Sequence, residues 1–115
     1  DVLRVVLNKP EGLTYIPGQA ADIALNKPDW NEKKNCFTFT SLPEDDHIEF
    51  TIKTYPEHHG MTNELLSAQP GDEVIIYDSF GDIYFKGQGI FIAGGAGVTP
   101  FIAILKNLQT TIYRN

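Results

Sequence analysis

The chain has 115 residues, enough for one domain with its own hydrophobic core. Hydrophobic residues make up 42% and charged residues 21%, which indicates neither disorder nor a membrane span. A net charge of −6 argues against a nucleic-acid-binding surface, because binding phosphate backbones requires clustered Lys and Arg. One cysteine, Cys36, excludes an internal disulfide, and no signal peptide is visible, so we expect a cytoplasmic protein.

Short apolar or alternating segments, separated by turn residues, fill the first part of the chain. The alternation is clearest at 48–53, where Ile48, Phe50 and Ile52 predict a half-buried strand. Similar patterns predict strands at 1–7, 19–25, 36–41, 74–77 and 83–85, and a short helix at 61–68 with Leu65 and Leu66 facing inward. Closely spaced strands with only one small helix are typical of an antiparallel barrel or sandwich.

The pattern changes near residues 87–89, where we place a domain boundary between 1–88 and 89–115. An apolar run at 90–93 leads into clustered glycines and then an apolar helical pattern, which predicts strand, tight loop and helix. Thr99 suits the helix N-cap and Pro100 the first helical position. Gly95 and Gly97 would let the backbone approach a nucleotide phosphate closely, and the alternative is a turn that needs glycine for packing alone.

Four motifs follow one another along the chain. They are an aromatic-plus-hydroxyl strand at 35–38, a Gly-x-Thr loop at 60–62, Pro-Gly-Asp at 70–72, and Gly-Gly-Ala-Gly-Val-Thr-Pro at 94–100. In this order they resemble the ferredoxin-NADP reductase superfamily, most closely its flavodoxin-reductase-like members.

The resemblance implies a mainly β fold: a six-stranded antiparallel Greek-key flavin-binding barrel with one short helix, then the first strand-turn-helix of an α/β NAD(P)-binding domain. It also implies that the first barrel strand precedes residue 1 and that most of the nucleotide domain follows residue 115. We therefore expect little NAD(P)H-dependent turnover from this chain alone.

The same resemblance implies roles for the residues at 35–38. Phe37 would lie against the isoalloxazine ring, and the Thr38 hydroxyl would lie near its redox-active edge, which makes Thr38 the catalytic candidate. Asn35 stands where the family has an arginine that binds the flavin phosphate, so one charge-assisted contact is absent there. Lys33 or Lys34 is a candidate to reach that phosphate instead.

Further cofactor-binding candidates follow from the same motifs. Thr62, with the backbone of the loop before it, would hold the flavin phosphate or pyrophosphate. A helix N-cap with Glu64 in the first turn is the compatible structural interpretation of Thr62. The other candidates beside the cofactor are Cys36, without a catalytic role, and Lys53, Thr54, Tyr55, Gly60 and Met61.

The resemblance implies an NAD(P)H-dependent flavin oxidoreductase that uses FAD, with FMN as the second choice. Electrons would pass to a protein carrier such as ferredoxin, flavodoxin or an oxygenase component. The alternative is a non-catalytic flavin-binding or structural module of a larger electron-transfer protein. We expect no metal site, because His58 and His59 are adjacent on the chain and point in opposite directions.

Overall fold

The computed structural model describes residues 2–55 and 57–114, with the backbone alone for 110–114. Its strands are β1 (Val2–Asn8), β2 (Ala20–Leu25), β3 (Asn35–Thr38), β4 (His47–Lys53) and β5 (Val74–Phe80). Its helices are α1 (Met61–Glu64) and α2 (Thr99–Arg114), and two 3-10 turns, η1 (Leu65–Ser67) and η2 (Gly95–Val98), adjoin them. Within the described residues, neither helix has the length and hydropathy needed to cross a membrane.

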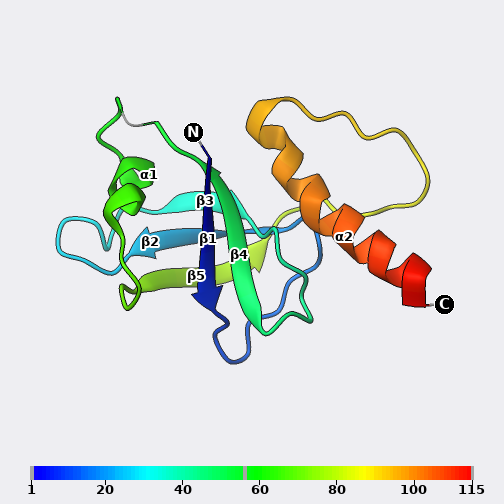
Figure 1. Ribbon diagram of the computed structural model, residues 1–115, viewed down its shortest axis with the longest axis horizontal. Helices are drawn as coiled ribbons and strands as arrows, with labels where there is room; N and C mark the ends of the chain where they lie inside the picture. Colours follow the sequence, from blue (N-terminus) through cyan, green and yellow to red (C-terminus); the bar gives the residue numbers. More distant parts are fainter. Residues whose placement is uncertain (1, 56, 115) are drawn as a thin grey trace.

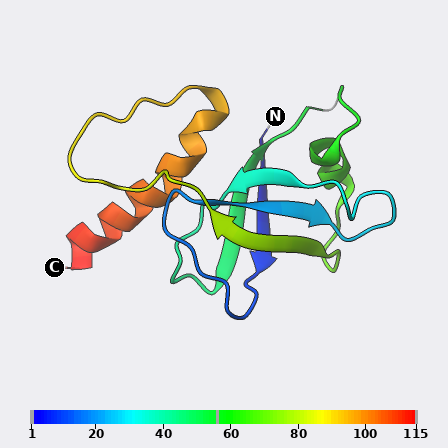
Figure 2. The same ribbon diagram turned by 180° about the vertical axis from the view of Figure 1, so that it is seen from behind.

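The strands form two antiparallel sheets that pack across one another. One sheet has the order β1-β4 and the other β3-β2-β5. Figure 1 shows β1 and β4 crossing in front of the other three strands, and Figure 2 shows the three-stranded layer from behind. The two helices lie at opposite ends of this pair of sheets (Figure 1). The antiparallel, mainly β class and the short helix are therefore confirmed.

The core forms where the inward-facing residues of both sheets meet. Ile48, Phe50 and Ile52 of β4 are all buried, as the alternation at 48–53 predicts. The ring of Phe39 stacks on Tyr15 with the centroids 3.9 Å apart and packs against Phe50 at 5.0 Å. These three rings connect the two sheets through apolar contact.

The sheets are joined by backbone pairing at one place in the described chain, an antiparallel bridge between Phe39 and Phe50. β1 and β5 each keep one free edge, and a groove with a volume of about 690 Å³ runs beside β1. The described residues form five strands in two sheets, so the expected closed six-stranded barrel, whose first strand we place before residue 1, is not confirmed in strand count or closure.

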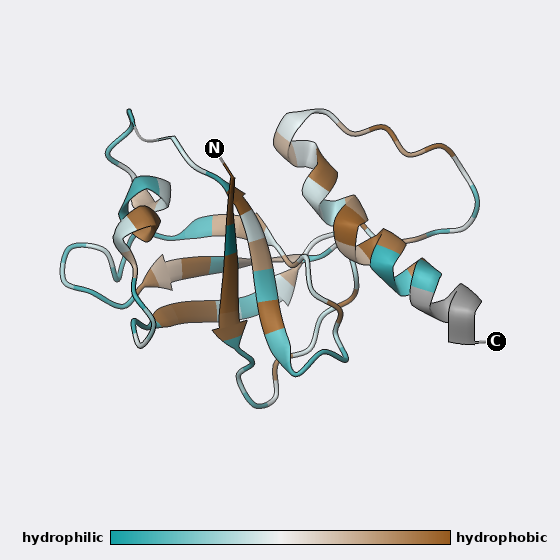
Figure 3. Cartoon of the chain, in the orientation of Figure 1, coloured by the Kyte–Doolittle hydropathy of each residue, from teal (hydrophilic) through white to brown (hydrophobic). Residues whose placement is uncertain are grey.

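Two predicted strands are absent from the structure. Residues 83–85 and 90–93 lie in an irregular segment that leaves the body of the protein and returns at η2 (Figure 1). Both segments are apolar (Figure 3), and Ile90 and Ile92 are 90% and 86% exposed. A strand requires a neighbouring strand for its backbone hydrogen bonds, and none lies beside either segment. β5, in contrast, continues to Phe80, beyond the predicted end at residue 77.

The helix ends also differ from the sequence predictions. α1 begins after Gly60, so Thr62 lies inside the first turn and is not the N-cap. Leu65 is buried as predicted, but Leu66 is 48% exposed, because the chain tightens into a 3-10 turn there. α2 begins at Thr99 itself, and the Thr99 hydroxyl donates a hydrogen bond to the Ala96 carbonyl instead of capping an amide. Pro100 is consequently the second helical residue.

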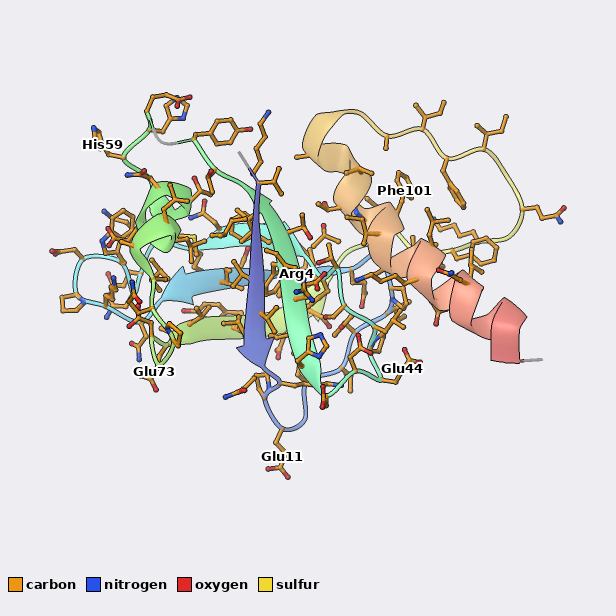
Figure 4. All side chains as sticks on the ribbon, in the orientation of Figure 1. Arg4, Glu11, Glu44, His59, Glu73 and Phe101 are labelled. Atoms are coloured by element: carbon orange, nitrogen blue, oxygen red, sulfur yellow. The ribbon has the colours of Figure 1, made fainter. Side chains whose placement is uncertain are left out.

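α2 is tied to the sheets through the buried carboxylate of Glu49 on β4. Arg4 projects from β1 toward β4 (Figure 4), and its Nε lies 2.6 Å from Glu49 Oε2. Thr40 donates its hydroxyl to Glu49 Oε1 at 2.8 Å. Lys106 of α2 donates to the Thr40 carbonyl at 2.7 Å and lies 3.4 Å from Glu49 Oε1. Burial acts to raise the pKa of Glu49, but these hydrogen bonds and charges outweigh it, so its pKa is lowered.

We predict that Glu49→Gln lowers the free energy of unfolding by about 1–2 kcal/mol at neutral pH. The effect is limited to this size because its partners Arg4 and Lys106 are partly exposed and screened by solvent. Because the folded pKa lies below the unfolded one, this contribution is present above the ordinary glutamate pKa and is lost as pH falls through the folded value. Urea unfolding from pH 7 to pH 3 measures it. Glu11→Gln is the control, since Glu11 points into solvent at the β1–β2 turn (Figure 4). An equal effect at every pH would contradict the assignment.

Gly18 fixes how the segment after β5 passes over the sheets. Its φ is +105°, and a Cβ there would lie 2.3 Å from the Ile83 carbonyl oxygen and 3.0 Å from Ile104 Cδ1. Gly12 has a similar φ of +83° but faces open space. The absence of a side chain at Gly18 therefore allows the Ile83 backbone and the Ile104 side chain of α2 to approach the β1–β2 connection closely.

We predict that Gly12→Ala lowers the free energy of unfolding by ~1 kcal/mol, because alanine disfavours the positive φ at this position. Gly18→Ala should cost about 2 kcal/mol more, because the added methyl group collides with backbone. Chemical denaturation of the two variants measures the difference. Equal stabilities would show that the segment around Ile83 does not pack on Gly18.

Candidate functional site

A pocket opens where β3 and β4 separate beyond the Phe39–Phe50 bridge. β3 continues along β2 and β4 continues along β1, so the two strands diverge. Their separation leaves a cavity of about 310 Å³, at the lower end of the ~300–1,000 Å³ typical of small-molecule sites. We call it the β3–β4 pocket. It is lined by Asn35, Cys36, Phe37, Thr38, Thr51, Ile52, Lys53, Tyr55, Thr62, Ala96 and Thr99.

The register of the bridge gives the pocket two distinct ends. Continuing the antiparallel pairing of Phe39 with Phe50 places Thr38 across from Thr51 and Cys36 across from Lys53. In Figure 1, β3 runs from the side of α1 toward the side of α2, so its Thr38 end lies on the side of α2. Its Asn35 end, near Lys53 in this register, lies on the side of α1, which contributes Thr62 to the lining.

The lining combines aromatic surface, hydroxyl groups and a single charged side chain. Phe37 is half-buried, and its ring centroid lies 6.4 Å from that of Phe50. One side of the ring therefore packs on the core, and the other lines the pocket. Tyr55 supplies a second ring and stacks on His58 at 5.6 Å. Lys53 carries a positive charge, and none of the lining residues is Asp or Glu, although the whole chain has 15 of them. The pocket is therefore suited to a planar ligand that carries negative charge.

Cys36 lies at the pocket as an exposed thiol. Partial burial raises its pKa, and the carboxylate of Asp22 on β2 adds to the effect. The thiol therefore stays protonated at neutral pH.

The structure brings together residues that are far apart in sequence. Of the predicted site residues, the pocket contains Asn35, Cys36, Phe37, Thr38, Lys53, Tyr55, Thr62 and Thr99. The remaining predicted residues, Thr54, Gly60, Met61, Gly95, Gly97 and Pro100, lie beside the pocket residues along the chain without lining it. Met61 and Thr54 are 3% and 2% exposed, and Met61 belongs to the hydrophobic core.

Sequence reasoning did not find Thr51, Ile52 or Ala96. Thr51 and Ile52 belong to the strongly alternating segment 48–53, and their nearness to the predicted Lys53 was an available signal. Ala96 stands between the two predicted glycines, and η2 turns it toward the pocket.

Lys33 and Lys34 do not line the pocket. Lys33 Nζ lies 4.7 Å from the centre of the Trp30 ring, and Lys34 Nζ lies 4.0 Å from that of Tyr77 on β5. Both ammonium groups therefore cover aromatic surface outside the pocket.

The larger groove beside β1 is less suited to such a ligand. Its lining includes Asp72, Glu73, much of β1 and the turn before β5, with no aromatic side chain. Figure 4 shows Glu73 below α1, at the turn before β5. Carboxylates and an unpaired strand edge fit an extended peptide better than an anionic ring system. Among the described residues, no three His, Cys, Asp or Glu side chains gather as a metal site.

Comparisons with known proteins relate the chain to electron-transfer reductases. It is 30% identical to the reductase component of propane 2-monooxygenase from Rhodococcus jostii over 95% of its length, which is 30% of that protein. It is 27% identical to component C of methane monooxygenase from Methylosinus trichosporium over 94% of its length and 34% of that protein. The chain thus spans about a third of the length of these relatives. No protein-family profile matches it.

A solved structure shares the fold. The ferredoxin NADP+ reductase from Neisseria gonorrhoeae, with bound FAD and NADP, superposes with a TM-score of 0.75 at 17% identity. The superposition covers 95% of this chain and 46% of that protein.

The state of Cys36 gives a direct test of the pocket's environment. We predict that a disulfide reagent such as DTNB labels Cys36 more slowly than glutathione at pH 7.5, because its raised pKa leaves less thiolate. The rate should continue to rise at pH values where the glutathione rate has levelled off. As Cys36 is the single cysteine, the signal has one source. A plateau at lower pH than for glutathione would contradict the burial of the thiol.

Proposed function

Because this chain belongs to the ferredoxin-NADP reductase superfamily, we propose that its β3–β4 pocket binds a flavin, with FAD as first choice and FMN as second. The chain would be the flavin-binding part of an NAD(P)H-dependent oxidoreductase. The observation that carries this proposal is the convergence of β3, β4, α1 and α2 on one pocket with two aromatic rings, a lysine and no carboxylate.

The residues present fit a flavin. Phe37 and Tyr55 offer aromatic surface for a planar ring system. The hydroxyls of Thr38, Thr51 and Thr62 both donate and accept hydrogen bonds, so they suit a ring whose protonation changes. When bound, the flavin supplies the redox chemistry, and the protein supplies binding, orientation and electrostatics.

Thr38 is our candidate for the residue beside the reactive edge of the ring. It lies at the end of the pocket that adjoins η2 and α2, where Ala96 and Thr99 complete the lining. A nicotinamide nucleotide held along the glycine segment, with Gly95, Gly97 and Pro100 around it, would reach the pocket at this end. At the other end, Asn35, Thr54, Gly60 and Met61 would surround the ribityl and phosphate portion.

We assign residues 1–88 to a flavin-binding domain and 89–115 to the start of an NAD(P)-binding domain. Two features support this division. The apolar segment 90–93 is exposed, and an apolar run before a glycine turn and a helix suits a parallel strand covered on both faces. The free edges of β1 and β5 border the groove beside β1, where one further strand would complete the barrel.

The electron acceptor we propose is a protein, an oxygenase component first and ferredoxin or flavodoxin next. The relatives named as monooxygenase reductase components support this order. We place the protein in the cytoplasm. The alternative is a non-catalytic flavin-binding module. Adding NADH or NADPH to a longer version of the protein distinguishes the two, because the flavin bleaches only in a reductase.

We predict that the purified chain binds FAD and FMN, with quenched flavin fluorescence and slower DTNB labelling of Cys36. Phe37→Ala should weaken binding about tenfold through lost ring contact. Phe85→Ala is the matched control, because Phe85 is 40% exposed and lies outside the pocket. Circular dichroism of both variants checks that the fold is kept. A colourless protein that takes up neither flavin and leaves Cys36 unprotected would refute the proposal.

A further inference from the structure

We propose that Lys53 binds the phosphate of the flavin, in place of the arginine that the superfamily has where this chain has Asn35. This inference rests on the flavin-binding function proposed above and assigns the phosphate to the α1 end of the β3–β4 pocket. The contacts of the basic side chains, their charge environment and the strand register carry it.

The other described arginine and lysine side chains contact groups outside the pocket. Arg4 pairs with Glu49, and Lys27 pairs with Glu64. Lys9 donates to the carbonyls of the 43–45 turn, and Lys106 donates to that of Thr40. The remaining lysines lie over rings that do not line the pocket: Lys33 over Trp30, Lys34 over Tyr77 and Lys86 over Tyr84.

Lys53 differs because its aromatic partner is itself a pocket residue. Lys53 Nζ lies 5.4 Å from the centre of the Tyr55 ring, and both residues line the pocket. The contact places the ammonium group beside a ring that lines the pocket, and a cation above a ring still presents N–H donors to an anion.

The strand register explains how Lys53 can replace a cation at position 35. Continuing the pairing of Phe39 with Phe50 places Cys36 across from Lys53, so Asn35 and Lys53 lie at the same end of the pocket. Thr62 enters at this end from α1 and adds a hydroxyl donor. A cation on β4 thus faces the space that an arginine at 35 would reach from β3.

The charge environment favours an anion at this end. The chain carries a net charge of −6, yet no Asp or Glu lines the pocket. An approaching phosphate would therefore meet one positive charge and several hydroxyls in the lining, and Asp22, which pairs with Cys36 from β2, lies outside that lining. As Lys53 is exposed, solvent screening limits the gain, and we expect an effect of about tenfold on affinity.

The test compares FMN, which has a phosphate, with riboflavin, which lacks one. Fluorescence titration gives both dissociation constants for the wild type, Lys53→Gln, and the controls Lys33→Gln and Lys34→Gln. We expect Lys53→Gln to weaken FMN binding about tenfold and to leave riboflavin binding unchanged, with neither control altering the FMN-to-riboflavin ratio. Raising the salt concentration should weaken FMN binding to the wild type more than to Lys53→Gln.

A second variant, Lys53→Gln with Asn35→Arg, should restore the FMN preference by placing the cation on β3. The inference is overturned if Lys53→Gln leaves the FMN-to-riboflavin ratio unchanged, or if it weakens only the binding of 2′,5′-ADP. Failure of the wild type to bind either flavin would refute the flavin function itself, which distinguishes the two results.

Discussion

The pairing of Phe39 with Phe50 is the constraint on which the rest of the structure depends. It joins the two sheets by backbone at one point, and the stacked rings of Tyr15, Phe39 and Phe50 fill the space behind it. Beyond this point β3 and β4 follow different partners, so they separate and open a pocket. The same contact that closes the core therefore creates the site.

A second set of contacts positions the pocket's other wall. Lys106 holds α2 against the Thr40 carbonyl and the Glu49 carboxylate, close to where the sheets join. Glu49 is buried because Arg4, Thr40 and Lys106 satisfy it, and a buried carboxylate without such partners would be costly. η2 and the start of α2 are thereby held beside the Thr38 end of the pocket. The geometry thus brings the two proposed domains to one site.

Much of the fold and of the candidate site follows from local sequence pattern. Alternation at 48–53 specifies β4. The resemblance carried by the ordered motifs places β3, Lys53, Tyr55 and Thr62 beside one cofactor and Thr99 in a separate nucleotide-binding turn, and the fold brings all of them to one pocket. Local pattern failed at 83–85 and 90–93, because apolar residues favour a strand but cannot supply its neighbour. It also failed at Glu49, since alternation predicts an exposed carboxylate, whereas contacts from β1 and α2 bury it. Ala96 was missed because its role depends on a turn that only the fold defines.

The location of the bound flavin distinguishes the β3–β4 pocket from the groove beside β1. Nuclear magnetic resonance of the ¹⁵N-labelled chain, titrated with FMN, reports which backbone amides change. We expect shifts at Asn35–Thr38, Thr51–Lys53, Thr62, Ala96 and Thr99, with little change along β1 and the 69–74 turn. Shifts concentrated in the groove beside β1, or saturable FMN binding without change at Asn35–Thr38, would contradict binding in the β3–β4 pocket.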